Sequence, residues 1–308
     1  FREVEALGYS TVFVPDHFDE GAGPIAALAA AAVVTTTINV GSLVLDCDFR
    51  HPVVLARELA TIDQLSEGRF ELGIGAGWKA LDYEHSGIPM DRPGVRVSRM
   101  IEHLQVLRAL FADGPVNFAG EHYTVTDLEG TPKPFRPGGP PIVIGGGAPR
   151  LLRFAGANAD IVGVNASIHS GEVDAAAAQD GLAASIDQKV AWVKEGAGDR
   201  FDQLELNAWL AIAEITDDAD GYAEAVAPAF CRLANRSQDG GRLQPVECSL
   251  EAVVIPHTGA TAHEGQDFIG CGSHQARRLQ PSITCFDNLR SGPDQNVRIP
   301  DRRQAMLR

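Results

Sequence analysis

An acid and an imidazole stand side by side in the segment VFVPDHF, residues 12–18, directly after a β-branched run. Histidine is the side chain whose charge changes near neutral pH, and an adjacent carboxylate can orient it or charge it. Asp16 and His17 are therefore candidates for proton transfer. On these residues alone a simple capping pair explains the dipeptide as well, so both interpretations stay open.

A glycine-rich turn follows the strand-like run in LGIGAGW, residues 72–78. Gly73, Gly75 and Gly77 allow either a tight turn or a close approach of the backbone to a planar ligand. A dinucleotide fingerprint needs a helix that opens at once after the glycines, and residues 78–94 instead predict a polar loop that contains prolines. The turn therefore gives only weak support for a nucleotide site.

A second glycine turn, in PIVIGGGAPRLLRFAG, gives a stronger signal. The glycines at 145–147 end a strand-like run, and Pro149 marks the expected start of a helix. Free amide groups at a helix N-terminus bind anions, and Arg150 would add a positive charge in the first turn. This segment predicts a phosphate site, with a tight strand-to-helix turn as the alternative.

Other chemistries lack the residues that they need. The nine histidines contain neither an HExxH motif nor a pair four residues apart, and the cysteines and histidines near the C-terminus lack zinc spacing, so we expect no metal site. The chain has no GxSxG motif, and no serine or cysteine has an identifiable base partner. Covalent acyl transfer is therefore not expected.

Length and composition bound the class of protein. With 308 residues, 44% of them hydrophobic, the chain suffices for one α/β barrel or two smaller domains. A formal net charge of −15 argues against binding to nucleic acid, and no apolar run is long enough to span a membrane. The five cysteines form no CxxC motif, so we expect a reducing, cytoplasmic setting.

Strand-like and helix-like runs alternate along the chain, which predicts parallel strands joined by helices. Such strands belong either to a doubly wound sheet or to a closed barrel. We expect long loops at 76–95 and 114–140. The expected strands are at 11–14, 37–45, 69–75, 141–146, 160–164 and 204–215, and the expected helices at 51–68, 95–112, 149–157, 184–196 and 219–229.

Composition changes near residue 230. Residues 1–230 hold 16 Lys and Arg against 33 Asp and Glu, whereas residues 231–308 hold 10 against 8, all ten of them Arg. We expect a barrel domain over 1–230 and an atypical segment over 231–308 that is poorly ordered or non-native. A small appended domain is the alternative.

Four segments follow one another along the chain: GYSTVFVPDHF, TTTINVGSLVL, RHPVVLARELATIDQLSEGRFELGIGAGW and PIVIGGGAPRLLRFAGANADIVGV. Together, in this order, they resemble the luciferase-like family of flavin and deazaflavin oxidoreductases, and within it the branch that uses coenzyme F420. The implied partner is a small-molecule substrate. The resemblance covers roughly residues 1–220 and implies a (β/α)8 TIM barrel. Phe1 would fall in the first helix, so the chain would lack the first barrel strand, and closure at the C-terminal side is left open.

The resemblance also implies a cofactor site. Asp16 and His17 would point into the cofactor pocket, and a bulge with a non-prolyl cis peptide within residues 41–44 would support the ring. Trp78 stands where some members have a glutamate for substrate chemistry, which argues against a sugar-phosphate substrate. The residues implied in cofactor binding are Ser42, Leu43 and Val44 at the bulge, Gly75, Ala76 and Gly77 beside the ring, and Gly145, Gly146, Gly147, Ala148 and Arg150 at the phosphate.

The implied activity is hydride transfer between coenzyme F420 and a small organic substrate. His17 would give or take a proton, and Asp16 would orient His17 or bond to the ring. Two alternatives remain: an FMN-dependent luciferase-like monooxygenase, and a degenerate chain that binds a cofactor without catalysis. Dimers are common in the family, so we expect a homodimer.

Overall fold

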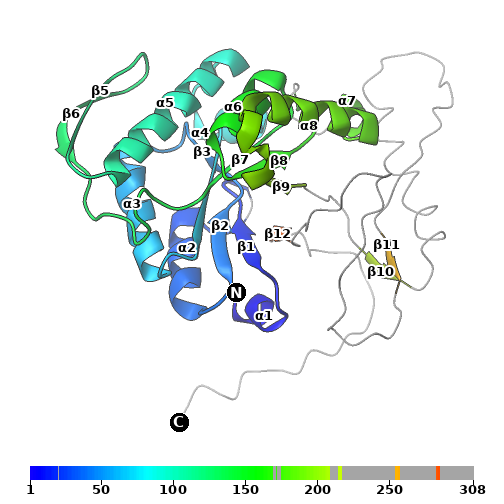
Figure 1. Cartoon of the computed structure of the whole chain (residues 1–308), viewed down its shortest axis with the longest axis horizontal. Coiled ribbons are helices and arrows are strands. Elements are labelled where there is room, and N and C mark those ends of the chain that lie inside the picture. Colours follow the sequence, from blue (N-terminus) through cyan, green and yellow to red (C-terminus); the bar gives the residue numbers. More distant parts are fainter. Residues whose placement is uncertain are drawn as a thin grey trace, which may run out of the picture.

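The computed structural model describes residues 1–19, 21–168, 171, 175–208, 214–216, 254–256 and 282–284. Eight strands form one sheet in the order β12-β1-β2-β4-β7-β8-β9, with β3 paired to β4, and every ladder in it is parallel (Figure 1). Their bounds are β1 Thr11–Val14, β2 Asn39–Ser42, β3 Leu45–Asp46, β4 Phe70–Gly75, β7 Ile142–Gly146, β8 Ile161–Val164, β9 Glu205–Asn207 and β12 Ser282–Thr284.

The central strands are mostly apolar and buried along their whole length because both faces of the sheet are covered. Every residue of β1, β4 and β8 is buried. Parallel strands joined by helices are packed on both sides, so they show continuous hydrophobic runs and no alternation. This pattern made the strands recognisable in the sequence.

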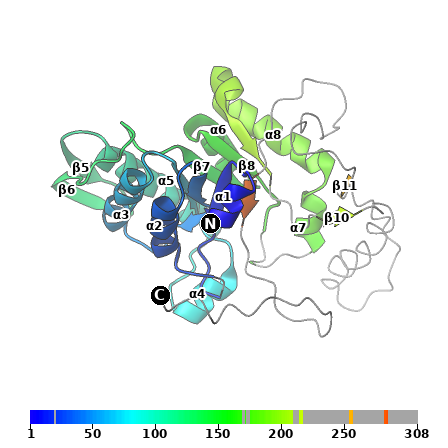
Figure 2. The same ribbon diagram turned by 90° about the horizontal axis from the view of Figure 1, so that it is seen from below.

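The helices between the strands begin in a consistent way. Four of them, α2, α3, α5 and α6, have a proline in the first turn, where its missing N–H costs no hydrogen bond. Figures 1 and 2 show the helices around the sheet. The bounds are α1 Arg2–Ala6, α2 Pro24–Val34, α3 Pro52–Leu65, α4 Ala80–Ser86, α5 Pro93–Phe111, α6 Pro149–Asn158, α7 Ala175–Asp180 and α8 Ala183–Ala197, with a 3-10 turn at Gly198–Gln203.

One continuous core joins the sheet to its helices. Leu55, Leu59 and Ile62 of α3 face inward with at most 1% exposure, as their spacing on one helix face requires. They belong to the same apolar cluster as Phe70 and Leu72 of β4. No helix in the described ranges is long and apolar enough to cross a membrane.

The expected loops contain regular structure. The segment 76–95 contains the helix α4, and 114–140 contains an antiparallel hairpin of β5, Pro115–Ala119, and β6, Thr124–Glu129. Seven residues give too short a periodicity to reveal α4. The hairpin extends away from the sheet and its helices (Figure 1). Its two strands are short, so buried and exposed residues alternate over only a few positions.

The other expected elements agree with the structure, with two differences. The run at 37–45 forms two strands, β2 and β3, and the run at 204–215 forms β9 and the start of β10, Glu214–Thr216, which pairs with β11, Val254–Pro256. The helix expected at 219–229 lies outside the described residues. So does 231–308, apart from β11 and β12, and the domain boundary at 230 stays a prediction.

Candidate functional site

The candidate residues gather at one edge of the sheet. His17 follows β1, Ser42 ends β2, Gly75 ends β4 and Gly146 ends β7. These four strands are neighbours in the sheet and all parallel, so their carboxyl ends meet at the same edge. Parallel α/β folds bind their ligands at this edge, which we call the carboxyl edge.

A bulge separates β2 from β3. The peptide bond between Leu43 and Val44 is cis, within the range where the family resemblance placed such a bond. The Ser42 hydroxyl donates to the Gly73 carbonyl at 2.9 Å and accepts from the Gly73 amide at 3.0 Å, which attaches the bulge to β4. A Cβ on Gly73 would lie 1.9 Å from the Ser42 carbonyl oxygen, and one on Gly75 would lie 2.6 Å from Val44 Cγ2. These glycines make room for the bulge.

Asp16 is buried and paired with Arg50. The two guanidinium nitrogens donate to its carboxylate oxygens at 2.5 and 3.1 Å, and the Asp46 amide donates to the same carboxylate at 3.1 Å. The expectation that Asp16 orients His17 is therefore wrong, because its carboxylate is directed to Arg50 and to the chain at β3. A bond from Asp16 to a cofactor ring stays a prediction.

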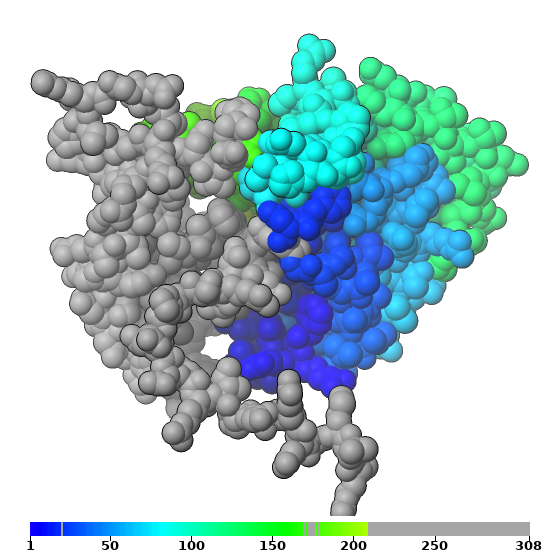
Figure 3. Space-filling view, turned by 180° about the vertical axis from the view of Figure 1, so that it is seen from behind, coloured from blue at the N-terminus to red at the C-terminus, as the bar shows by residue number. Residues whose placement is uncertain are grey.

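The carboxylate beside His17 belongs to Asp82 on α4. Its Oδ2 lies 2.6 Å from His17 Nδ1, and its Oδ1 accepts the Phe18 amide at 3.2 Å. The Trp78 ring meets the imidazole edge to face, with centroids 5.5 Å apart. In Figure 3 the cyan segment around α4 lies directly against the blue N-terminal segment. Sequence reasoning missed this pairing, since it had placed Asp82 in a loop.

The neighbouring tyrosine of α4 joins a buried acidic network. The Tyr83 hydroxyl lies 2.7 Å from Asp46 and 3.0 Å from Asp48, and Arg99 donates to Asp48 at 2.9 Å. Burial raises the pKa of Asp46 to about 6. Ligand atoms of Asp46, Cys47 and Asp48 lie within 4.8 Å of one another, but both carboxylates are engaged by Tyr83, so we assign no cation to them.

The three glycines after β7 differ in what surrounds them. A Cβ on Gly146 would lie 2.5 Å from the Leu151 side chain, and one on Gly147 would lie 2.5 Å from the Ser167 amide. Packing within the protein therefore explains these two glycines without a ligand. The nearest atom to a Cβ on Gly145 would be Asn165 Nδ2 at 3.1 Å.

Asn165 carries an unsatisfied polar atom at the carboxyl edge. It directly follows β8, and its Oδ1 is buried without a hydrogen-bond partner among the described residues. Buried polar atoms in native proteins nearly always have a partner, so an orphan beside the Gly145 turn suits a site that receives a polar ligand. Sequence reasoning did not single out Asn165.

Arg150 lies in the first turn of α6, next to Ala148 at the N-cap. Its guanidinium donates to the Gly94 carbonyl at 3.0 Å and to Ser98 Oγ at 2.9 Å, so in this structure it joins α6 to α5. A role for Arg150 or Ala148 at a phosphate stays a prediction.

A hollow of about 430 Å³ lies at the opposite edge of the sheet, between Arg108, Arg136 and the chain that enters β7 at Ile142. A second, of about 290 Å³, adjoins it near Lys133. Ligands of parallel α/β folds bind at the carboxyl ends of the strands, so we base the site on the edge that holds His17 and not on these hollows.

Comparison with known proteins identifies the family. A model of the family described as luciferase-like monooxygenase matches residues 1–244. The chain belongs to the luciferase-like monooxygenase family. This confirms the family that the four sequence segments indicated.

Curated relatives of this luciferase-like chain include a dehydrogenase and a reductase. The F420-dependent glucose-6-phosphate dehydrogenase of Amycolatopsis mediterranei (strain U-32) is 32% identical over 164 residues, which cover 51% of this chain and 49% of the relative. The 5,10-methylenetetrahydromethanopterin reductase of Archaeoglobus fulgidus is 32% identical over 163 residues, covering 53% and 47%. The chain spans about half the length of these relatives.

Solved structures show the same fold. The coenzyme F420 dependent tetrahydromethanopterin reductase from Methanopyrus kandleri gives a TM-score of 0.58 at 23% identity, covering 73% of this chain and 64% of that chain. The monooxygenase RslO1 from Streptomyces bottropensis gives 0.57 at 19% identity, covering 74% and 68%. The expectation of a luciferase-like TIM-barrel fold is confirmed.

Proposed function

We propose that this luciferase-like protein is an oxidoreductase that transfers a hydride between coenzyme F420 and a small organic substrate. One observation carries the proposal. His17, the bulge after β2 and the glycine turns after β4 and β7 all lie at the same edge of the sheet. The F420-dependent names of two relatives about one third identical support the choice of cofactor.

The residues at the carboxyl edge fit such a cofactor. The unpartnered Asn165 oxygen offers a polar contact, and the bulge presents backbone close to the ends of β2 and β4. Residues 42–44 would lie against the ring, residues 75–77 beside it, and the amides of residues 145–148 would hold a phosphate. When bound, the deazaflavin supplies the carbon that gives or takes the hydride.

The chain itself would handle the proton. Reduction of a carbonyl needs one proton as well as a hydride, and His17 supplies an imidazole at this edge, a side-chain type that serves as a general acid or base. Asp16 is already neutralised by Arg50, which suits a fixed hydrogen-bonding group and not a proton carrier. Trp78 packs on the imidazole. By the family resemblance it stands where some members have a glutamate for substrate chemistry, which disfavours a sugar-phosphate substrate.

Replacement of His17 by Ala tests the proposal. Turnover with reduced F420 and a panel of small carbonyl compounds should fall by about 100-fold or more, because general acid catalysis is lost. The affinity for F420, measured by the upward shift of the melting temperature, should change little. His85→Ala, at an exposed position of α4, is the matched control. Equal turnover in His17→Ala would remove His17 from the reaction.

Two other outcomes would replace the proposal. Tight FMN binding with oxygen uptake, and no response to F420, would indicate an FMN-dependent monooxygenase. A broad melt that responds to neither cofactor would indicate a chain without catalytic function.

A further inference from the structure

The helix α4 connects two strand ends through adjacent residues. Asp82 contacts the chain after β1, and Tyr83 contacts the acids at β3 and just beyond it. Gly87, in the left-handed conformation at φ 73°, ends the helix after seven residues. A short helix held at both contacts can place a side chain more precisely than a loop can.

Both oxygens of the Asp82 carboxylate have defined partners. Oδ1 accepts from the Phe18 backbone amide, and this bond fixes the carboxylate relative to the chain that carries His17. Oδ2 then lies 2.6 Å from His17 Nδ1. The Asp82 side chain is 5% exposed and that of His17 15%, so water competes weakly for this contact.

A carboxylate can only accept a hydrogen bond, so the nitrogen that it contacts must carry a proton. Nδ1 of His17 therefore holds a hydrogen in the neutral ring as well as in the charged ring. Among the described residues, His17 Nε2 has no hydrogen-bond partner. A ring held in this tautomer leaves Nε2 available to accept a proton.

We propose that Asp82 is the positioning residue of His17: it keeps the proton on Nδ1, so that Nε2 exchanges a proton with the substrate. The proposal rests on the role of His17 in the proposed function. In carbonyl reduction, the reduced cofactor would supply the hydride for the new C–H bond, and the imidazolium would give its Nε2 proton to the oxygen. The neutral ring would keep its proton on Nδ1, where it is donated to Asp82, and solvent would restore the proton at Nε2.

The other acids near His17 do not take this role. Asp16 is paired with Arg50, as described above. Asp19 is paired with Lys79 at 2.6 Å, and this contact holds the pKa of Asp19 below its usual range. Asp82 is thus the carboxylate that contacts the imidazole within the described part of the chain.

Nitrogen NMR of the full-length chain with ¹⁵N-labelled histidine tests the tautomer directly. The His17 signals are assigned by their loss in His17→Gln. In the wild type we expect a protonated Nδ1 and, in the neutral ring, an unprotonated Nε2. In Asp82→Ala the neutral ring should move to the Nε2–H form or to a mixture, and Asp82→Glu should restore the Nδ1–H form. Glu84→Ala, an exposed acid on the same helix, should change nothing.

Turnover provides the second measurement. Asp82→Ala should lower it by about 10-fold or more without a matching loss of F420 affinity, and Asp82→Glu should recover part of it. If Asp82→Ala fails to fold, Asp82→Asn keeps the shape, removes the charge and should weaken the Nδ1–H preference.

The outcomes separate this proposal from the proposed function. A neutral wild-type His17 in the Nε2–H form, or an unchanged tautomer in folded Asp82→Ala or Asp82→Asn, would overturn the role of Asp82. Full turnover in His17→Ala would overturn the proposed role of His17 in proton transfer. The NMR result would still show whether Asp82 determines the tautomer of the His17 ring.

Discussion

At the scale of single residues, contacts within the protein explain why position 77 is a glycine. Gly77 has φ 71°, in the left-handed region that favours glycine, and a Cβ there would lie 1.8 Å from the Tyr83 hydroxyl and 2.4 Å from Asp46 Oδ2. The Ala76 and Gly77 carbonyls also accept hydrogen bonds from Arg96. Gly77 is therefore required by the turn from β4 to α4, whether or not a cofactor contacts it.

An alanine in the left-handed conformation costs about 1–2 kcal/mol. Gly77→Ala should destabilise the fold by clearly more than this, because Tyr83 must also move. Gly87→Ala is the matched control: it has φ 73° and open space around the added methyl group. Urea denaturation of both variants measures the two free energies of unfolding. Equal losses of unfolding free energy would show that Tyr83 and its hydrogen-bond partners rearrange at no energetic cost.

At the scale of elements, the amino ends of the strands carry a buried acid. Glu71 of β4 accepts from Asn39 Nδ2 at 2.8 Å and from Thr11 Oγ1 at 3.4 Å, so one carboxyl joins β4, β2 and β1. Burial, with the nearby Glu205 adding to it, raises the pKa of Glu71 from 4.5 to about 7. Between pH 4.5 and about 7, Glu71 is therefore protonated in the folded protein and ionised in the unfolded chain.

This difference predicts how stability depends on pH. The raised pKa of Glu71 stabilises the fold fully below pH 4.5, and the contribution is lost as the pH rises to about 7. Glu71→Gln stays neutral, so its stability relative to the wild type should grow across this window by on the order of 3 kcal/mol. Denaturation at several pH values measures it, with exposed Glu129→Gln as control. Parallel curves for wild type and Glu71→Gln would contradict the prediction.

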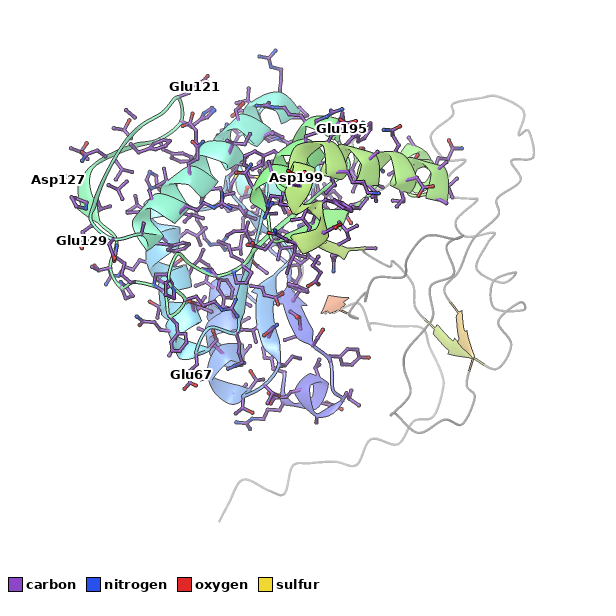
Figure 4. All side chains as sticks on the ribbon, viewed as in Figure 1. Glu67, Glu121, Asp127, Glu129, Glu195 and Asp199 are labelled. Atoms are coloured by element: carbon purple, nitrogen blue, oxygen red, sulfur yellow. The ribbon has the colours of Figure 1, made fainter. Side chains whose placement is uncertain are left out.

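At the scale of the whole molecule, acidic side chains are spread over the surface around a large apolar core. Figure 4 shows acidic side chains on the hairpin, on α8 and after α3, in keeping with the net charge of −15. The core runs without interruption from α2 and α3 through the sheet to α6 and α8. We therefore expect a substitution at its centre to destabilise the whole sheet and not one helix alone.

Leu59→Ala should lower the free energy of unfolding by about 2–5 kcal/mol, since Leu59 is fully buried in this core. Leu65→Ala makes the same change on the same helix at a side chain that is 42% exposed, and should cost far less. Chemical denaturation followed by circular dichroism compares the two. Similar costs at both positions would show that α3 is not packed as described.

The sequence by itself determined the family, the alternation of strands and helices, and the ends of the strands at which the candidate residues gather. Continuous apolar runs and proline at helix starts are local signals, so β1, β4, β7 and β8 could be recognised before the structure was known. The family resemblance placed a cis peptide within residues 41–44, and the structure has it between Leu43 and Val44.

The tertiary structure alone decided which side chains meet. His17 pairs with Asp82, 65 residues away, and Asp16 pairs with Arg50, 34 residues away. Such pairs depend on the order of strands in the sheet and on the placement of α4, a helix too short to leave a periodic signal. Asp16 and His17 are adjacent in the sequence, which suggested that their side chains contact each other. In the structure the two side chains point in different directions, to Arg50 and to Asp82.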